Sequence, residues 1–181
     1  GHPAPVAITL NYDSLLDQAM LNLGSKQGLR VPDYGCDLAI PAAPDAERFG
    51  RLLKLHGSLN WLYCRRCARL SLHMPGLNPK QGFLAIFEEM FAGLEVFVSF
   101  VEDVACERCQ GALAPLIITP SVLKDYRNPH VSRIWYEAEQ ELRKADRVVF
   151  VGYSLPWDDV DVIYLLKQSL AQLPPGRITV V

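Results

Sequence analysis

The chain has 181 residues, about the length of one domain, and half of it is hydrophobic. Charged residues make up 21% of it, an ordinary share for a globular protein that excludes a disordered chain. Eighteen basic residues against twenty acidic ones give a net charge of -2, which excludes a strongly basic nucleic-acid binder. No apolar run approaches the roughly 20 residues of a membrane-spanning helix, and the first residues lack the apolar core of a signal peptide. We therefore expect a cytoplasmic protein for which neither a membrane nor a nucleic acid is a partner.

Short apolar runs alternate with amphipathic patterns along most of the chain. The runs are nearly continuous, as in strands buried on both faces of a parallel sheet, and the patterns place apolar residues on one face of a helix. This alternation predicts an α/β fold with a Rossmann-like, doubly wound parallel sheet that is incomplete in this chain. In chain order we expect a strand at 6–10, a helix at 13–23, an irregular connection at 24–50, strands at 52–55 and 116–119, a helix at 132–145, a strand at 148–151, a helix at 158–173 and a strand at 178–181.

Four of the five cysteines form two pairs, each with two residues between its members. This spacing lets both thiolates of a turn face one ion, and four thiolates complete the tetrahedral shell of a structural zinc. Disulfides or a redox pair are the weaker alternatives, because the chain has no secretory signal. We read the fifth cysteine, Cys36, as a small buried hydrophobic residue. The predicted zinc ligands are Cys64, Cys67, Cys106 and Cys109.

Residues 64–109 interrupt the alternation of strands and helices. The middle of this segment, 81–100, carries a stripe of apolar residues that predicts a helix with a small local core, followed by a strand at 96–101. We expect residues 1–63 and 110–181 to form the Rossmann-like domain, and 64–109 to form a zinc-binding insertion. Because the first and last expected strands lie at the two ends of the chain, we expect a fragment of a longer protein.

Polar residues follow directly after several of the expected strands. Asn11 and Asp13 follow the first strand, His56 follows the second, and Gly152 and Ser154 follow the strand at 148–151. Because ligands of open α/β sheets bind beyond the carboxyl ends of the strands, we expect these residues to converge on one edge. An amide, a carboxylate, an imidazole and a hydroxyl suit a ribose or phosphate ligand. Each residue also has a structural interpretation: Asn11 or Asp13 as a helix cap, His56 as a core histidine, and Ser154 as a turn residue.

Four segments, in this order, resemble motifs of the sirtuin (SIR2-like) family. Residues 9–15, TLNYDSL, are similar to the T-x-N-Y-D form of bacterial SIR2-like domains, and 54–58, KLHGS, to the L-H-G-S/T motif. Residues 106–115 resemble the second cysteine pair of the family with the C-G-G-x-L-R-P that follows it, and 145–155 resemble its A-D-x-x-x-x-x-G-T-S-L segment. The upstream glycine-rich motif of the family, G-A-G-x-S, is absent from the chain.

The resemblance implies an NAD-binding Rossmann domain with a zinc ribbon that cleaves the nicotinamide–ribose bond of NAD. The enzyme would be an NAD hydrolase or an NAD-dependent protein deacylase, with NAD and, for the deacylase, an acylated protein as partners. Residues 118–120 replace the F-G-E triplet of the family, which favours hydrolysis. The resemblance also implies the roles of single residues. His56 would be the general base, Asn11 would order the water or acyl oxygen, and Asp13 would lie near the nicotinamide amide. The cofactor-binding residues would be Thr9, Asn11, Asp13, Gly152 and Ser154.

A second hypothesis is a non-catalytic zinc-ribbon module that binds a protein or a nucleic acid on a degenerate nucleotide-binding fold. Two features favour it. The chain has no G-x-G-x-x-G phosphate loop, and Arg65, Arg66 and Arg69 lie beside the first cysteine pair. Binding of NAD, compared with binding of a nucleic acid or a partner protein, separates the two hypotheses.

Overall fold

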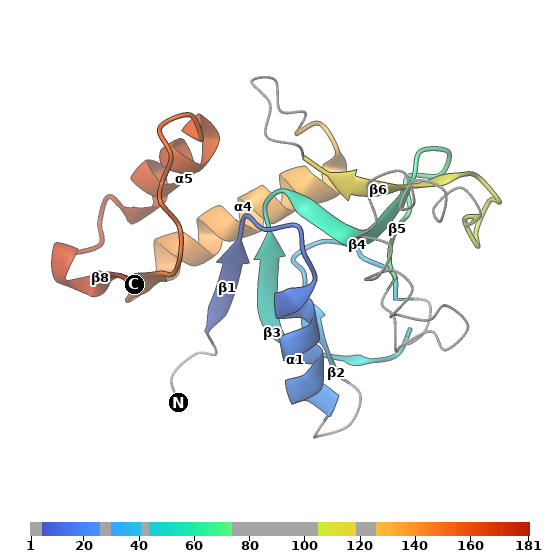
Figure 1. The fold of residues 1–181 in the computed structure, drawn as a ribbon, viewed down its shortest axis with the longest axis horizontal. Coiled ribbons are helices and arrows are strands. Elements are labelled where there is room, and N and C mark those ends of the chain that lie inside the picture. Colours follow the sequence, from blue (N-terminus) through green and yellow to red (C-terminus); the bar gives the residue numbers. More distant parts are fainter. Residues whose placement is uncertain (1–4, 26–29, 41–43, 74–104, 119–125) are drawn as a thin grey trace.

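The computed structural model describes residues 5–25, 30–40, 44–73, 105–118 and 126–181 (Figure 1). Strands and helices alternate over much of this part, so the chain has the predicted α/β class. The expected apolar stripe at 81–100 and the strand at 96–101 lie outside the described residues. The elements are β1 (Val6–Thr9), α1 (Leu15–Ser25), β2 (Arg30–Asp33), β3 (Glu47–Lys54), β4 (Gly57–Cys64), β5 (Leu70–Leu72), β6 (Leu113–Ile117), α4 (Pro129–Lys144), β7 (Val148–Phe150), α5 (Val160–Leu170), a 3₁₀ turn (Pro175–Arg177) and β8 (Ile178–Val180).

The first sheet is parallel, with strand order β1-β3-β2. Side chains alternate between the two faces of its central strand, β3. Lys54 contacts Asp17 on α1, whereas Arg51 forms ion pairs with Glu137 and Glu141 on α4. Because Lys54 and Arg51 are three positions apart on β3, they point to opposite faces. Helices α1 and α4 therefore cover opposite faces of this sheet, the arrangement of a doubly wound fold.

Residues 24–50, expected to be irregular, contain β2 and the first part of β3, so that prediction was wrong. Strand β2 is short and includes Pro32, which has no backbone N–H donor. A proline within a run of residues argues against a strand in the sequence, so this strand was not predicted. The structure tolerates this proline because β2 lies at the edge of the sheet, where the register shifts between Val31 and Asp33.

The second sheet is antiparallel, with strand order β5-β4-β6. Residues 116–119 had been expected to add a strand to the parallel sheet, but β6 instead pairs antiparallel with β4, from Gly57↔Ile117 to Cys64↔Leu113. A short apolar run is typical of a buried strand in either kind of sheet, so its sequence could not distinguish them. Only Leu55 and His56 separate β3 from β4, so the chain passes from one sheet to the other at this corner.

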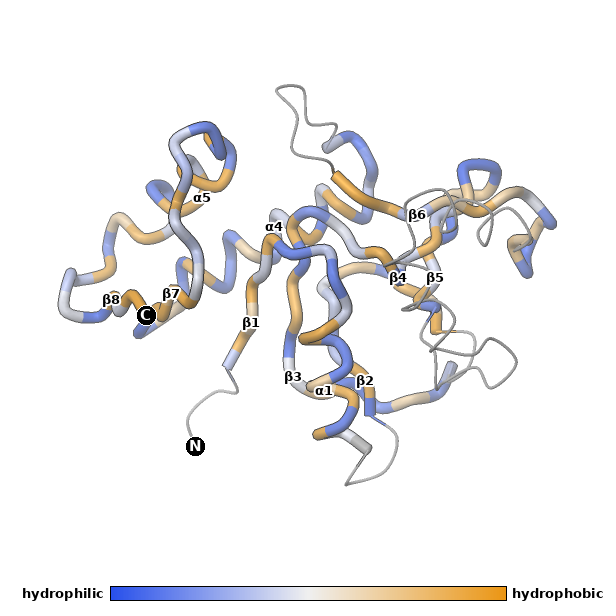
Figure 2. Tube along the Cα trace, in the orientation of Figure 1, coloured by the Kyte–Doolittle hydropathy of each residue, from blue (hydrophilic) through white to orange (hydrophobic). Residues whose placement is uncertain are grey.

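The predicted strands at 148–151 and 178–181 form a separate parallel pair, β7-β8. In the described part of the chain, this pair shares no strand with the β1-β3-β2 sheet, so the single continuous sheet that we expected is divided. Figure 2 shows hydrophobic residues along both β1 and β7. Figure 1 shows α4 extending from the β1-β3-β2 sheet to the β7-β8 pair. Helix α4 also packs against α5.

The predicted helices at 13–23, 132–145 and 158–173 are confirmed, with bounds shifted by a few residues. Helix α4 starts at Pro129, and the Asn128 side chain caps it by accepting hydrogen bonds from the N–H groups of His130 and Val131. Its apolar stripe packs into one main core shared by β3, β4 and α4. No helix in the described ranges is long and apolar enough to cross a bilayer.

Candidate functional site

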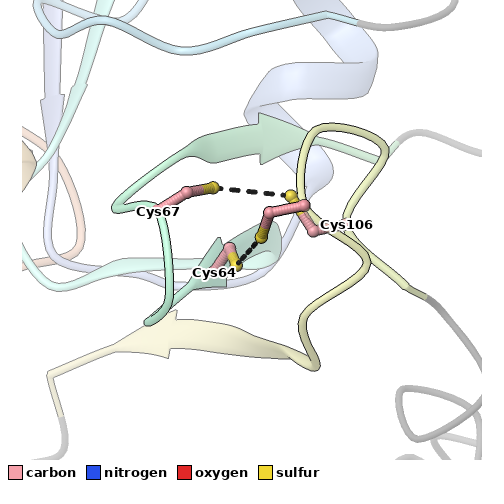
Figure 3. A group of neighbouring side chains, drawn as sticks. Cys64, Cys67 and Cys106 are labelled. Atoms are coloured by element: carbon pink, nitrogen blue, oxygen red, sulfur yellow. Dashed lines mark hydrogen bonds between the residues drawn. The ribbon is translucent and has the colours of Figure 1, made fainter.

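The four paired cysteines come together at one end of the second sheet (Figure 3). The Sγ atoms of Cys64 and Cys109 lie 3.4 Å apart, those of Cys67 and Cys106 lie 3.6 Å apart, and all four sulfurs lie within 4.8 Å of one another. Sulfurs bound at 2.3 Å to a tetrahedral zinc are about 3.8 Å apart. The cluster thus has the ligand type, number and spacing of a structural zinc site, and a Cys36 ligand is not needed to complete it.

The backbone around the cluster forms two similar turns. The Cys64 N–H donates to Arg69 O at 2.9 Å, and the Cys106 N–H donates to Gly111 O at 2.9 Å. Space is tight at the second turn, because a Cβ atom on Gly111 would lie 3.2 Å from Cys64 Sγ and 3.3 Å from Cys109 Sγ. These contacts hold the sulfurs in place from the turn after β4 and from the turn before β6.

The environment of the cluster favours thiolate over thiol at two of the cysteines. Burial raises the pKa of Cys64, but the backbone N–H groups of Cys67 and Arg66 and the neighbouring thiols lower it by more, to about 7. At Cys106, the lowering by backbone N–H groups likewise outweighs the effect of burial on the pKa. The thiolate is the form that binds a metal, so these donors favour ion binding at Cys64 and Cys106. At Cys109 the Gly111 N–H lowers the pKa, but burial and the neighbouring cysteines raise it by more, to about 12.

The segment that follows β1 lies against the corner between β3 and β4. The Leu55 N–H donates to Thr9 O at 3.0 Å, and the Leu59 N–H donates to Tyr12 O at 2.9 Å. The Ser58 hydroxyl also donates to Tyr12 O at 3.3 Å. Two candidate residues, Asn11 and His56, therefore belong to neighbouring segments beyond the carboxyl ends of two parallel strands.

The side chains of the segment after β1 have both structural contacts and exposed surface. The Thr9 hydroxyl accepts from the Asn11 N–H at 3.1 Å, and Asp13 Oδ1 accepts from the Leu15 N–H at 2.9 Å at the start of α1. The structural interpretation of Asp13 as a helix cap is thus present in the fold. The Asn11 side chain is exposed, and Asp13 is half-buried.

His56 is nearly buried, with 8% of its surface exposed. Its ring lies beside Trp135 of α4, with ring centroids 6.5 Å apart, and the Trp135 indole N–H donates to Leu55 O at 2.8 Å. The His56 carbonyl accepts from the Ile118 N–H at 2.9 Å. The corner that carries His56 is therefore held by β1, by β6 and by an aromatic side chain of α4.

A cavity of about 610 Å³ lies between β1, β7, α5 and the C-terminal end of α4. Thr9 and Asn11 line it from the end of β1, and Gly152 and Tyr153 line it from the end of β7. Leu55 also lines it, directly before His56. The other candidates are not among the residues that line the cavity. His56 lies directly after Leu55, and Asp13 lies two residues after Asn11. Ser154 is exposed, two residues beyond Gly152.

Sequence reasoning missed a buried polar network beside this segment. Lys54 and Asp17 form an ion pair at 2.7 Å, and both side chains are almost fully buried. Tyr34 Oη donates to Asp17 Oδ1 at 2.8 Å, and Asn60 Nδ2 lies 3.3 Å from the same oxygen. The signal available in the sequence was a lysine inside the apolar run 52–55. Only the structure shows that Asp17 lies on the buried side of α1, because Leu15, Leu16 and Leu23 of that helix are exposed.

No family model and no curated protein matches the chain. Solved structures that resemble it include one on the mechanism and regulation of Sir2 enzymes, with 18% identity, a TM-score of 0.42 and coverage of 91% of this chain and 46% of that one. A structure on sirtuin substrate affinity has 15% identity and a TM-score of 0.36, and the match covers 94% of this chain and 66% of that one. A Sir2–p53 peptide–NAD+ structure has 16% identity, a TM-score of 0.33 and coverage of 72% and 48%. The chain thus spans less than half the length of the first structure. At identities this low, the likeness to these structures bears on the fold alone and not on the activity.

Proposed function

We propose that this chain carries a SIR2-like site that binds NAD and cleaves its nicotinamide–ribose bond. The observation that carries the proposal is the hydrogen-bonded junction between the segment after β1 and the β3–β4 corner. This junction brings the segments of Asn11 and His56 together where open α/β sheets bind ligands. The adjoining cavity of about 610 Å³ is of a size used for small-molecule sites, and it extends to Gly152 at the end of β7.

In the proposed reaction, the bond between the ribose C1′ and the nicotinamide nitrogen breaks, and the electron pair leaves with nicotinamide. Positive charge develops on the ribose, so oriented dipoles and a base near neutral pH are required. His56 accepts a proton from a ribose hydroxyl, and the Asn11 amide orients the attacking oxygen. Asp13 lies near the nicotinamide amide, and Thr9, Gly152 and Ser154 bind the ribose and phosphates.

The attacking oxygen decides between the two activities that we propose. Water gives ADP-ribose and makes the protein an NAD hydrolase, with the proton of that water passing to solvent. The oxygen of an acylated lysine makes it a deacylase. The replacement of the F-G-E triplet by Ile118-Thr119-Pro120 favours water.

We propose zinc as a structural ion, bound by Cys64, Cys67, Cys106 and Cys109. Four thiolates leave no open coordination position, so the zinc takes no part in bond cleavage. In this division, residues 64–109 are the zinc-binding insertion, and 1–63 and 110–181 form the NAD-binding domain. Because β4 joins Cys64 to the corner that carries His56, the zinc also supports the site.

The proposal is tested by nicotinamide release from NAD in the full-length protein, with and without an acetyl-lysine peptide. Removing a general base lowers the rate about 10²–10⁴-fold, so we expect His56→Ala to have an effect of this size. His73→Ala, directly after β5, is the matched control and is expected to keep wild-type activity. Release that requires the peptide identifies a deacylase, and peptide-independent release identifies a hydrolase. A folded wild-type protein that releases no nicotinamide, or a fully active His56→Ala variant, would contradict the proposal.

A further inference from the structure

The Lys54–Asp17 pair is a charged contact inside an otherwise apolar part of the fold. The two side chains are 1% and 0% exposed, and Lys54 lies on β3 directly after Leu52 and Leu53 of the core. Taking two charges out of water is costly, and well-packed apolar residues often stabilise a fold as well as a buried ion pair does. The stability of the sheet alone therefore gives no reason for a lysine at this position.

The ammonium group of Lys54 makes one contact that an apolar side chain cannot make. It donates to the backbone carbonyl of Asp13, at the point where the chain leaves the segment after β1 and enters α1. Asp17, one turn further along α1, holds the same ammonium at 2.7 Å. Tyr34, directly after β2, and Asn60 on β4 in turn hold the Asp17 carboxylate. The lysine thus contacts the Asp13 carbonyl and the Asp17 carboxylate directly, and Tyr34 and Asn60 hold that carboxylate.

We propose that Lys54, held by Asp17, is a positioning residue that fixes the loop 11–13 so that Asn11 faces the bound ribose. The inference rests on the proposed function. Two further contacts, Tyr12 O with the Leu59 N–H and with the Ser58 hydroxyl, hold the middle of this loop. Lys54 ties the C-terminal end of the loop to the sheet, so without the ammonium only the Asp13–Leu15 cap contact with α1 holds that end.

The test uses the full-length protein with the double substitution Lys54→Met and Asp17→Asn. The pair becomes neutral, an asparagine oxygen still accepts from Tyr34 and Asn60, and the donor to the Asp13 carbonyl is lost. Hydrogen exchange is expected to quicken at least tenfold at the amides of Leu15 and Leu59, which bond to this loop, and to stay unchanged at Leu55. We expect kcat for nicotinamide release to fall at least tenfold, with a smaller change in KM for NAD.

The matched control neutralises an exposed ion pair on α4 by Arg143→Met and Glu139→Gln, and it is expected to leave exchange and kinetics unchanged. If the double variant of the buried pair does not fold, Lys54→Gln combined with Asp17→Asn replaces it, because the glutamine amide keeps N–H donors at this position and the pair stays neutral; the expectations are the same at reduced size. Failure of both variants to fold would show that the pair serves stability and would overturn the positioning role.

The outcomes separate this inference from the proposed function. Wild-type exchange at Leu15 and Leu59 in a folded variant overturns the positioning role, whatever the activity. Faster exchange with unchanged kcat overturns it as well. A wild-type protein that releases no nicotinamide defeats the proposed function, while the exchange rates still decide whether Lys54 holds the loop.

Discussion

Replacing Cys64 with serine is expected to abolish stoichiometric zinc binding and to unfold the β4–β5–β6 sheet. Cys64 is buried at the end of β4, and its sulfur lies 3.4 Å from that of Cys109, so no other side chain can take its place in the cluster. The apparent binding free energy of structural zinc is about 10–16 kcal/mol in zinc-finger peptides, comparable with the whole stability of a typical domain, about 5–15 kcal/mol. Elemental analysis and thermal melting followed by circular dichroism measure the two effects.

Cys36 provides the control for this experiment, because it is a half-buried cysteine outside the cluster. Cys36→Ser is expected to keep one zinc per chain, and a strong chelator is expected to reproduce the Cys64→Ser melting curve in the wild-type protein. A Cys64→Ser protein with full zinc content and an unchanged melting temperature would show that the cluster does not hold the ion.

The substitution Gly57→Ala is expected to disrupt the corner that carries His56. Gly57 has a φ of +76°, and an added Cβ would lie 2.0 Å from the backbone carbonyl oxygen of Leu116. The strained backbone alone costs about 1 kcal/mol, and the clash with backbone atoms cannot be relieved by a side-chain rotation. We expect a total loss of more than ~3 kcal/mol in the free energy of unfolding, together with loss of nicotinamide release.

Urea denaturation and the nicotinamide assay measure these two losses. Gly176→Ala is the matched control, because no atom lies within 4 Å of its added Cβ, and we expect a change within about 0.5 kcal/mol. A Gly57→Ala protein as stable and as active as the wild type would mean that the corner tolerates a different backbone path.

The elements that sequence reasoning predicted well carry strong local signals. Helix α4 was predicted at 132–145 from its apolar stripe of 3.6-residue period, and the helix starts earlier, at Pro129 after the capping Asn128. The paired cysteines predicted a cluster from spacing alone, because two intervening residues leave few ways to orient two thiols. In both cases, residues close together in the chain determine the local geometry.

The features that sequence reasoning missed depend on contacts between distant segments. Strand β6 has an apolar run like those of the parallel sheet, and only its pairing with β4 makes it antiparallel. Strand β2 carries a proline that an edge position tolerates. The Lys54–Asp17 pair becomes meaningful only when α1 packs on β3 and brings the two charges to 2.7 Å.

Sequence reasoning predicted part of the arrangement of the candidate residues. The rule that polar residues gather beyond the carboxyl ends of parallel strands led us to expect Asn11 near His56, and backbone hydrogen bonds join their two segments. The rule could not foresee that the sheet is divided between β1 and β7, with a cavity between them. The catalytic and binding roles of these residues remain predictions.

The most direct test of the account is a calorimetric titration of the full-length protein with NAD. The wild type and Gln172→Ala, a substitution at an exposed residue beyond α5, are expected to bind NAD equally. Asn11→Ala removes an amide at the mouth of the proposed pocket and is expected to weaken binding at least tenfold. Equal affinity of all three proteins, or no heat of binding from folded wild-type protein, would contradict the account.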